Sequence, residues 1–153
     1  VVPFFIKERR TGRLPITHPD MTRFWITLQQ GVDFVLKSFD RMAGGELFVP
    51  KIPSMRVIDL ARAIGPDCRH EIIGIRPGEK LHEMMISSDD SRHTSEFPEH
   101  YVIEPEHSWW SEKDLTRGAE VPTDFCYSSE RNDRWLNADE LHEMIRTFVD
   151  KTE

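Results

Sequence analysis

Residues 74–83 read Gly-Ile-Arg-Pro-Gly-Glu-Lys-Leu-His-Glu, and this stretch decides how the chain is interpreted. Pro77 fixes its φ angle and Gly78 leaves φ free, so the backbone can turn tightly and direct N–H groups outward. Arg76 presents a planar fork of donors that suits phosphate, and a helix beginning near Glu79 would add its positive end. The stretch therefore predicts an anion-binding loop that runs into a helix. Spacing alone leaves an alternative, an ordinary turn with Arg76 on the surface.

Working outward, the flanking elements alternate between strand and helix patterns. Residues 71–75 have strand character and lead into the turn, and residues 46–50 are apolar enough for a short strand. A helix is predicted before Gly44-Gly45, with an apolar stripe at Leu28, Val32, Val35, Leu36, Phe39 and Met42. A second helix is predicted between Ser54 as N-cap and Gly65-Pro66, with its stripe at Val57, Ile58, Ala61 and Ile64.

The second half of the chain is less regular until its last helix. Residues 87–98 are polar and predict an exposed loop, and residues 101–103 predict a strand. Residues 108–125 are irregular and include Trp109 and Trp110. The last helix has a capping box of Asn137 and Glu140 and an apolar stripe at Leu141, Met144, Ile145 and Phe148. Short strands between helices predict an α/β fold class.

Composition limits the classes of function. A chain of 153 residues is one domain or a large part of one, and its net charge of −7 disfavours nucleic-acid binding. Basic residues nevertheless crowd the first part, which suits a small anionic ligand. No apolar run approaches the roughly 18–20 residues that cross a bilayer, so no membrane partner is expected and a cytoplasmic location is the default. Cys68 and Cys126 are single and widely spaced, which indicates neither a disulfide framework nor a metal site.

Motifs for catalysis, cofactor binding and metal binding are missing from the sequence. There is no GxGxxG and no GxxxxGK, and no tyrosine has a lysine four positions later. His82-Glu83 and His142-Glu143 each begin like HExxH, but neither has the second histidine. We therefore assign no catalytic, cofactor-binding or metal-binding residue in this chain.

The chain begins on an apolar stretch, Val1-Val2-Pro3-Phe4-Phe5, without an initiator Met. Such a stretch normally has a partner element before it, so we expect the chain to be the C-terminal part of a longer protein. A missing partner would leave apolar surface exposed, and the isolated chain is then expected to be marginally stable.

A second group of candidate binding residues precedes the first predicted helix. Pro15-Ile16-Thr17 is typical of an extended segment whose backbone and Thr17 hydroxyl could hydrogen-bond a flat polar ring. Arg23 lies beside two aromatic residues and could meet an anion or stack on a base. The alternative is that Phe24 and Trp25 belong to the core and Arg23 is solvated.

Four ordered segments resemble one family over nearly the whole chain. They are Val-Val-Pro-Phe-Phe at 1–5, Met-Thr-Arg-Phe-Trp-Ile-Thr at 21–27, Gly-Glu-Leu-Phe-Val-Pro-Lys-Ile-Pro-Ser-Met at 45–55 and the stretch at 74–83. Together they are similar to the C-terminal half of the inverting UDP-N-acetylglucosamine 4,6-dehydratases. These enzymes belong to the extended short-chain dehydrogenase/reductase superfamily, in the branch of polysaccharide biosynthesis proteins.

The resemblance implies a Rossmann domain that holds NADP and a small mixed α+β domain that binds UDP-sugar, with short strands and three or four helices. Residues 1–153 would be the C-terminal, UDP-sugar-binding portion, without the N-terminal Rossmann domain, so this chain alone would bind no NADP and be inactive. The complete enzyme would give a UDP-4-keto-6-deoxy-hexosamine, with inversion at C5, for pseudaminic acid and other bacterial surface glycans. Its catalytic Tyr-x-x-x-Lys pair and cofactor loop would lie upstream.

Carried onto this sequence, the resemblance implies five substrate-binding residues. Arg76 would bind the diphosphate of UDP and Glu79 the uridine ribose. Thr17, with neighbouring Ile16, would meet the uracil, and Val1 would lie against the nucleotide. Arg23 would be a helper or a structural residue.

Two alternatives stay open from the sequence. One is the C-terminal part of a related NDP-sugar epimerase, because the residues that separate these chemistries would lie upstream. The other is a non-catalytic oligomerisation module, in which Trp109, Trp110 and the apolar start form a protein interface. A homo-oligomer is expected of the full-length protein in either enzyme class.

Overall fold

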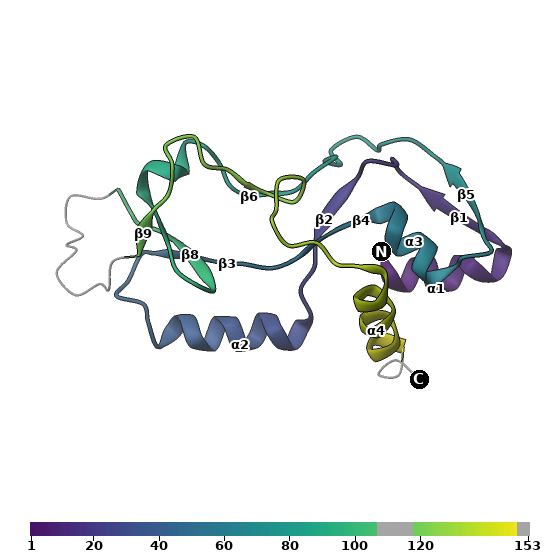
Figure 1. Ribbon diagram of the computed structural model, residues 1–153, viewed down its shortest axis with the longest axis horizontal. Helices are drawn as coiled ribbons and strands as arrows, with labels where there is room; N and C mark the ends of the chain where they lie inside the picture. The colour runs from purple at the N-terminus through teal and green to yellow at the C-terminus, as the bar shows by residue number, and fades with distance from the viewer. Residues whose placement is uncertain (107–117, 150–153) are drawn as a thin grey trace. The chain divides into compact units, whose positions relative to one another are not determined.

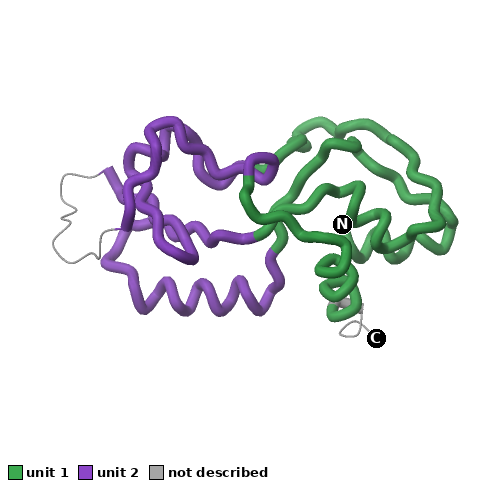
Figure 2. The backbone as a smooth tube through the Cα atoms, in the orientation of Figure 1, with its two compact units in different colours: residues 1–25, 53–83, 132–153 green, residues 26–52, 84–131 purple. Residues whose placement is uncertain are grey.

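The computed structural model describes residues 1–106 and 118–149 (Figure 1). The chain forms two compact units (Figure 2). Unit 1 comprises Val1–Trp25, Pro53–Glu83 and Asn132–Glu153, and unit 2 comprises Ile26–Ile52 and Met84–Arg131. The described residues contain four α-helices and many short strands, which confirms the predicted α/β class.

Unit 1 is built on two small two-stranded sheets and three helices. Its strands are β1 (Arg13–Ile16) parallel to β5 (Arg69–Ile72), and β2 (Thr22–Phe24) antiparallel to β4 (Ser54–Arg56). Its helices are α1 (Val2–Glu8), the 3-10 turn η1 (Arg9–Thr11), α3 (Val57–Ile64) and α4 (Ala138–Val149). Their apolar faces meet in one core of Val2, Phe5, Leu14, Ile16, Met21, Met55, Val57, Leu60, Ala61, Ile64, Leu141 and Ile145.

The start of α3 differs from the prediction. The helix has Arg56 as its N-cap, whereas Ser54 lies fully buried in β4. The Ser54 N–H donates to the Arg134 carbonyl, its own carbonyl accepts from Leu136 N–H, and its hydroxyl accepts from the Asn132 amide. Ser54 is therefore not an N-cap, because a segment about 80 residues away pairs with it. The end at Gly65 is as predicted.

Helix α4 begins as its sequence predicts. The Asn137 N–H donates to the Glu140 carboxylate, and the Glu140 N–H donates to the Asn137 side-chain oxygen. This reciprocal pair confirms the capping box. Leu141 and Ile145 are buried in the core of unit 1, while the side chain of Phe148 lies outside the described residues.

Unit 2 holds a four-stranded antiparallel sheet in the order β3-β8-β7-β9. The strands are β3 (Leu47–Pro50), β7 (Thr94–Glu96), β8 (His100–Ile103) and β9 (Ala119–Glu120). A further pair joins β6 (Met84–Ile86) to β10 (Tyr127–Ser128), and the 3-10 turn η2 (Asp90–His93) precedes β7. Strands β3 and β8 match the predicted strands. Trp109 and Trp110 lie outside the described residues.

The exposed loop predicted at residues 87–98 is wrong, because η2 and the inner strand β7 occupy it. Ser91 and Thr94 are buried. The Ser91 hydroxyl lies within hydrogen-bond distance of the Ser88 and Thr123 carbonyls, and the Thr94 hydroxyl donates to the Asp90 carbonyl. Backbone carbonyls thus satisfy these hydroxyls, so that a polar sequence can be buried.

Helix α2 (Leu28–Phe39) begins where its apolar stripe predicts, with a capping box of Thr27 and Gln30, but it ends at Phe39, before Met42 of the stripe. Its inward side brings the Phe34 ring to 6.3 Å from the His100 ring. The stripe itself faces outward in unit 2, with exposed fractions from 45% to 86% at Leu28, Val32, Val35, Leu36, Phe39 and Met42. The described part of the chain therefore leaves an apolar helix face uncovered. In the same ranges, no helix is long and apolar enough to cross a bilayer.

Candidate functional site

Residues 74–83 leave the end of β5 within unit 1. Strands β1 and β5 run parallel in the register Ile16 to Ile72, and the Ile73 N–H donates to the Ile16 carbonyl at 2.9 Å. Since the carboxyl ends of parallel strands share an edge, Thr17 follows β1 at the edge from which the loop departs. The fold thus brings together two segments that sequence reasoning selected separately.

The first part of the loop is one tight turn. The Glu79 N–H donates to the Arg76 carbonyl at 3.0 Å, Pro77 and Gly78 occupy the central positions, and Gly78 has φ of 82°. These are the features of a type II turn, in which the third residue needs positive φ. The Arg76 N–H also donates to the Glu79 carboxylate at 3.1 Å.

No helix follows this turn, so the helix predicted near Glu79 is wrong. The N–H groups of Arg76 and Glu79 are bonded within the turn, and Pro77 has none. The helix end expected to hold an anion is therefore absent, and within the turn of residues 76–79 only the N–H of Gly78 is left for a ligand. Any grip on an anion falls to the Arg76 side chain.

The Arg76 side chain is available for that role. Residue 76 is exposed, and no hydrogen bond or ion pair joins its guanidinium to another of the described residues. The guanidinium is a cation that offers paired N–H donors in a planar fork. The Glu79 carboxylate lies on the backbone of the same turn, so Arg76 and Glu79 are neighbours in space.

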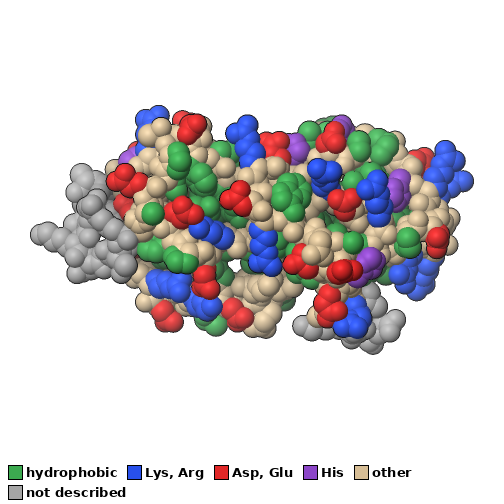
Figure 3. All heavy atoms as spheres, in the orientation of Figure 1, with side chains coloured by type: hydrophobic (Ala, Val, Ile, Leu, Met, Phe, Trp, Pro, Cys, Tyr) green, Lys and Arg blue, Asp and Glu red, His purple; other side chains and the backbone are tan. Residues whose placement is uncertain are grey.

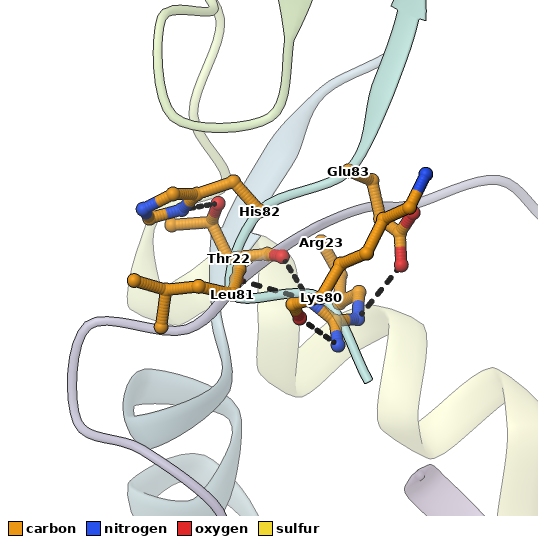
Figure 4. Close-up of polar contacts among 6 residues, drawn as sticks. All are labelled: Thr22, Arg23, Lys80, Leu81, His82 and Glu83. Atoms are coloured by element: carbon orange, nitrogen blue, oxygen red, sulfur yellow. Dashed lines mark hydrogen bonds and ion pairs between the residues drawn. The ribbon is translucent and has the colours of Figure 1, made fainter. Parts of the chain in front are cut away.

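Arg23 is placed quite differently. Its guanidinium donates to the carbonyls of Thr22 at 2.7 Å, Leu81 at 3.1 Å and Lys80 at 2.9 Å, and its Nε lies 3.5 Å from the Glu83 carboxylate (Figure 4). The Arg23 side chain is only 18% exposed. The two arginines that sequence reasoning proposed therefore have opposite surroundings in unit 1.

Two residues next to Arg23 and its partners, Thr22 and His82, were not selected as site residues from the sequence. Thr22 is buried, and its Oγ1 lies 2.8 Å from His82 Nδ1 (Figure 4). The Thr22 N–H donates to the Leu81 carbonyl. His82 had drawn notice only as a near miss to HExxH. The order of the segments gave no signal that residues 22 and 82 would meet.

Val1 is an exposed residue at the start of α1, and its carbonyl accepts the Phe5 N–H at 3.0 Å. Charged side chains of both signs are interspersed over the visible face of each unit (Figure 3). The described residues contain no group of three or more His, Cys, Asp or Glu side chains that could hold a metal ion.

Unit 2 contains a hollow of about 680 Å³ that includes none of these candidates. Its lining has four carboxylates (Asp40, Glu46, Glu99 and Glu104) but a single guanidinium from Arg41, which is unfavourable for a phosphorylated ligand. His100 in its wall stacks on Phe97 at 4.8 Å. Burial, followed by nearby Arg41, lowers the pKa of His100. Charge therefore favours the loop in unit 1 as the anion site.

Comparisons with known proteins bear on the family and on the fold of this chain. Residues 1–105 match the family described as polysaccharide biosynthesis protein. The chain is 51% identical, over 95% of its length, to a UDP-N-acetylglucosamine 4,6-dehydratase (inverting) of Campylobacter jejuni. It is 31% identical, over 97% of its length, to a UDP-glucose 4-epimerase of Rickettsia canadensis. The X-ray structure of Pen from Bacillus thuringiensis has the same fold, with a TM-score of 0.79 over 96% of the chain at 23% identity.

The matches cover only part of each relative. The chain spans 46% of the Campylobacter protein, 45% of the Rickettsia protein and 45% of the Pen chain. It therefore corresponds to about half the length of the curated relatives that it matches.

Proposed function

Because the chain belongs to the polysaccharide biosynthesis protein family, we propose that it is the UDP-sugar-binding portion of an inverting UDP-N-acetylglucosamine 4,6-dehydratase. The Campylobacter relative bears that activity in its name and shares half of the aligned residues. On this proposal, residues 1–153 hold the nucleotide, and the reaction depends on the part of such enzymes that has no counterpart here.

The main support for the proposal is the exposed guanidinium of Arg76, which belongs to a turn held by two hydrogen bonds. A diphosphate has several anionic oxygens, which an arginine can contact through two parallel N–H groups. Arg76 is exposed and not committed to any described partner, whereas the neighbouring Arg23 is fully engaged. Arg76 is therefore the proposed diphosphate ligand.

The remaining contacts follow from the same placement. Glu79 is proposed to bind the ribose hydroxyls through the carboxylate oxygen that does not accept from the Arg76 N–H. Thr17 is proposed to meet the uracil, since it follows β1 at the strand edge from which the loop departs, whereas Ile16 is fully buried in the core and is assigned no contact. Val1 is proposed to lie against the nucleotide.

NADP is the proposed cofactor of the complete enzyme, but the residues present do not fit it. A dinucleotide is held at a glycine-rich turn between a strand and a helix. The sequence has no GxGxxG, and its two positive-φ glycines near the candidate site, Gly74 and Gly78, lie in a loop that leads to no helix. We therefore assign no NADP contact and no reaction step to this chain, and we expect it to be inactive alone.

The wider context is proposed by family. The product would be a UDP-4-keto-6-deoxy-hexosamine that enters pseudaminic acid or a related bacterial surface glycan. The full-length enzyme would act as a cytoplasmic homo-oligomer.

Calorimetric titration of the chain with UDP-N-acetylglucosamine, UDP and uridine tests the proposal. UDP and the UDP-sugar should bind with similar affinity, and uridine should bind at least tenfold more weakly because it lacks the charge that Arg76 contacts. Equal binding of uridine and UDP would refute a diphosphate site. Conversion of UDP-N-acetylglucosamine by the chain with added NADP would refute the claim that it only holds substrate.

A UDP-glucose 4-epimerase is the second candidate, and the similarity to the Rickettsia protein over 97% of the chain favours it. Both enzymes would bind the UDP group of their substrate, so the proposed role of Arg76 is the same for the dehydratase and the epimerase. Product analysis of a complete protein that contains these residues separates them. An epimer of the substrate would identify the epimerase, and a 4-keto-6-deoxy sugar would identify the dehydratase.

A further inference from the structure

Arg23 joins β2 to the end of the loop that carries Arg76. Three hydrogen bonds reach the carbonyls of Thr22, Lys80 and Leu81, and the ion pair with Glu83 completes the set. Figure 4 shows these contacts as dashed lines that leave the guanidinium. The contacts with Lys80 and Leu81 bridge 57 and 58 residues of sequence, so they fix the loop to a distant element.

Thr22 extends the same connection. Its N–H donates to the Leu81 carbonyl, and its hydroxyl contacts His82. Strand β2 is itself anchored, because it pairs with β4 and because Met21 and Met55 lie in the core of unit 1. Residues 80–83 are therefore tied, through two adjacent residues, to a strand that packs on the core of unit 1.

The other end of the loop is also fixed. The Ile73 N–H donates to the Ile16 carbonyl, which continues the parallel pairing of β1 and β5. Between this point and Lys80 lie six residues, 74–79, with Arg76 in their centre and positive φ at Gly74 and Gly78. A short segment that contains two glycines would sample many conformations unless both of its ends were held.

We propose that Arg23 is a positioning residue that holds the Arg76 loop in the conformation that binds a nucleoside diphosphate, without touching the ligand. This inference rests on the proposed function for its ligand. A direct bidentate phosphate contact by Arg23 would need N–H groups that already bind Lys80, Leu81 and Glu83.

Hydrogen–deuterium exchange of the ligand-free chain tests the positioning role first. In Arg23→Ala, the amides of residues 74–83 should exchange at least tenfold faster, while those of α3 keep the wild-type rate. Arg62→Ala is the matched control, because it removes an arginine that pairs with Asp59 on the surface of α3 in the same unit. Unchanged exchange in the loop, or equal acceleration in α3, would overturn the inference.

UDP titration then separates positioning from direct contact. Arg23→Ala should weaken UDP binding roughly tenfold, the factor that corresponds to ordering about one backbone residue. Arg23→Lys should be nearly as weak, since it restores the charge but not the planar fork. Full rescue by Lys would instead indicate a direct electrostatic contact, and it would overturn the positioning role. Wild-type affinity in Arg23→Ala with a loosened loop would overturn it too.

A double-variant cycle completes the test. If Arg23 acts only through the loop, the tenfold loss on its removal should shrink to about threefold or less once Arg76 is alanine, because only the Glu79 contact of the loop then remains to be positioned. Independent, multiplying losses would overturn the inference. Should Arg23→Ala fail to fold, Glu83→Gln loosens the same segment more mildly and should raise loop exchange by a smaller factor. Failure of the wild type to bind UDP would refute the proposed function alone, because loop exchange is measured without ligand.

Discussion

Gly78→Ala probes the turn on which Arg76 stands. Gly78 has φ of 82°, and an added Cβ would meet no atom within 4 Å, so the cost is purely conformational. An L-residue in the left-handed region costs roughly 1–2 kcal/mol, which is an upper limit if the loop relaxes to another turn type. We expect UDP affinity to fall about fivefold to thirtyfold, with little change in melting temperature, since the loop is exposed.

Gly31→Ala is the contrasting variant. Gly31 lies inside α2, and its added Cβ would meet only the end of the Ile26 side chain at 4.0 Å. Alanine should stabilise unit 2 by about 1 kcal/mol through helix propensity and leave UDP binding unchanged. Calorimetric titration with UDP measures the affinity of both variants, and thermal melting measures their stability. Wild-type UDP affinity in Gly78→Ala would refute the reasoning that the turn geometry presents Arg76.

Three further predictions concern the stability of each unit. Tyr127→Phe should lower the free energy of unfolding by about 1–3 kcal/mol in denaturant titration, because the Tyr127 hydroxyl bridges the Ile52 N–H and carbonyl at 2.9 and 3.0 Å; no change would contradict that bridge. Leu60→Ala, at a fully buried site, should cost about 2–5 kcal/mol, whereas Leu36→Glu on the exposed stripe of α2 should cost less than about 0.5 kcal/mol. A large loss in Leu36→Glu would mean that the stripe is covered in solution. The pKa of His100 lies below its ordinary value, mainly through burial. As pH falls below about 6.5, His100 therefore gains its proton in the unfolded chain before it does so in the folded chain. Stability should therefore decrease on acidification from pH 7.5 to 5.5, and less so in His100→Phe; equal slopes would contradict the assignment.

Local signals in the sequence were sufficient to locate α2, α3 and α4, but they did not predict α1. The capping box of Asn137 and Glu140, the Gly65 stop and the spacing in α2 each involve residues within a few positions of one another. Such signals act through neighbouring backbone groups and can be recognised without knowing the fold. The α/β class followed from the order of these elements.

Hydrogen bonds between residues far apart in the sequence explain two of the wrong predictions. The helix expected after Glu79 is absent because Arg23 and Thr22 take the carbonyls of Lys80 and Leu81, which a helix would need for its own N–H groups. Ser54 is drawn into β4 by residues 132–136 in the same way. No spacing rule indicates partners so far apart in the chain.

The candidate site was predicted in part for the same reason. Arg76 and its turn could be selected because Arg-Pro-Gly is a contiguous signal with a known backbone consequence. The surroundings of Arg23 could not, because they depend on which carbonyls lie beside β2 after folding. The sequence also gave no indication that the apolar stripe of α2 would face outward in unit 2.

The most direct test of the account compares UDP binding by the wild type, Arg76→Ala and Lys80→Ala in one calorimetric series. Lys80 is an exposed cation four residues from Arg76, so its loss gives the same change in net charge in the same loop. Loss of an arginine–phosphate contact costs roughly 2–3 kcal/mol, and the account predicts a 30-fold to 150-fold weaker affinity for Arg76→Ala. Lys80→Ala should stay within about threefold of the wild type. Equal affinities in all three proteins would contradict the claim that Arg76 holds the diphosphate.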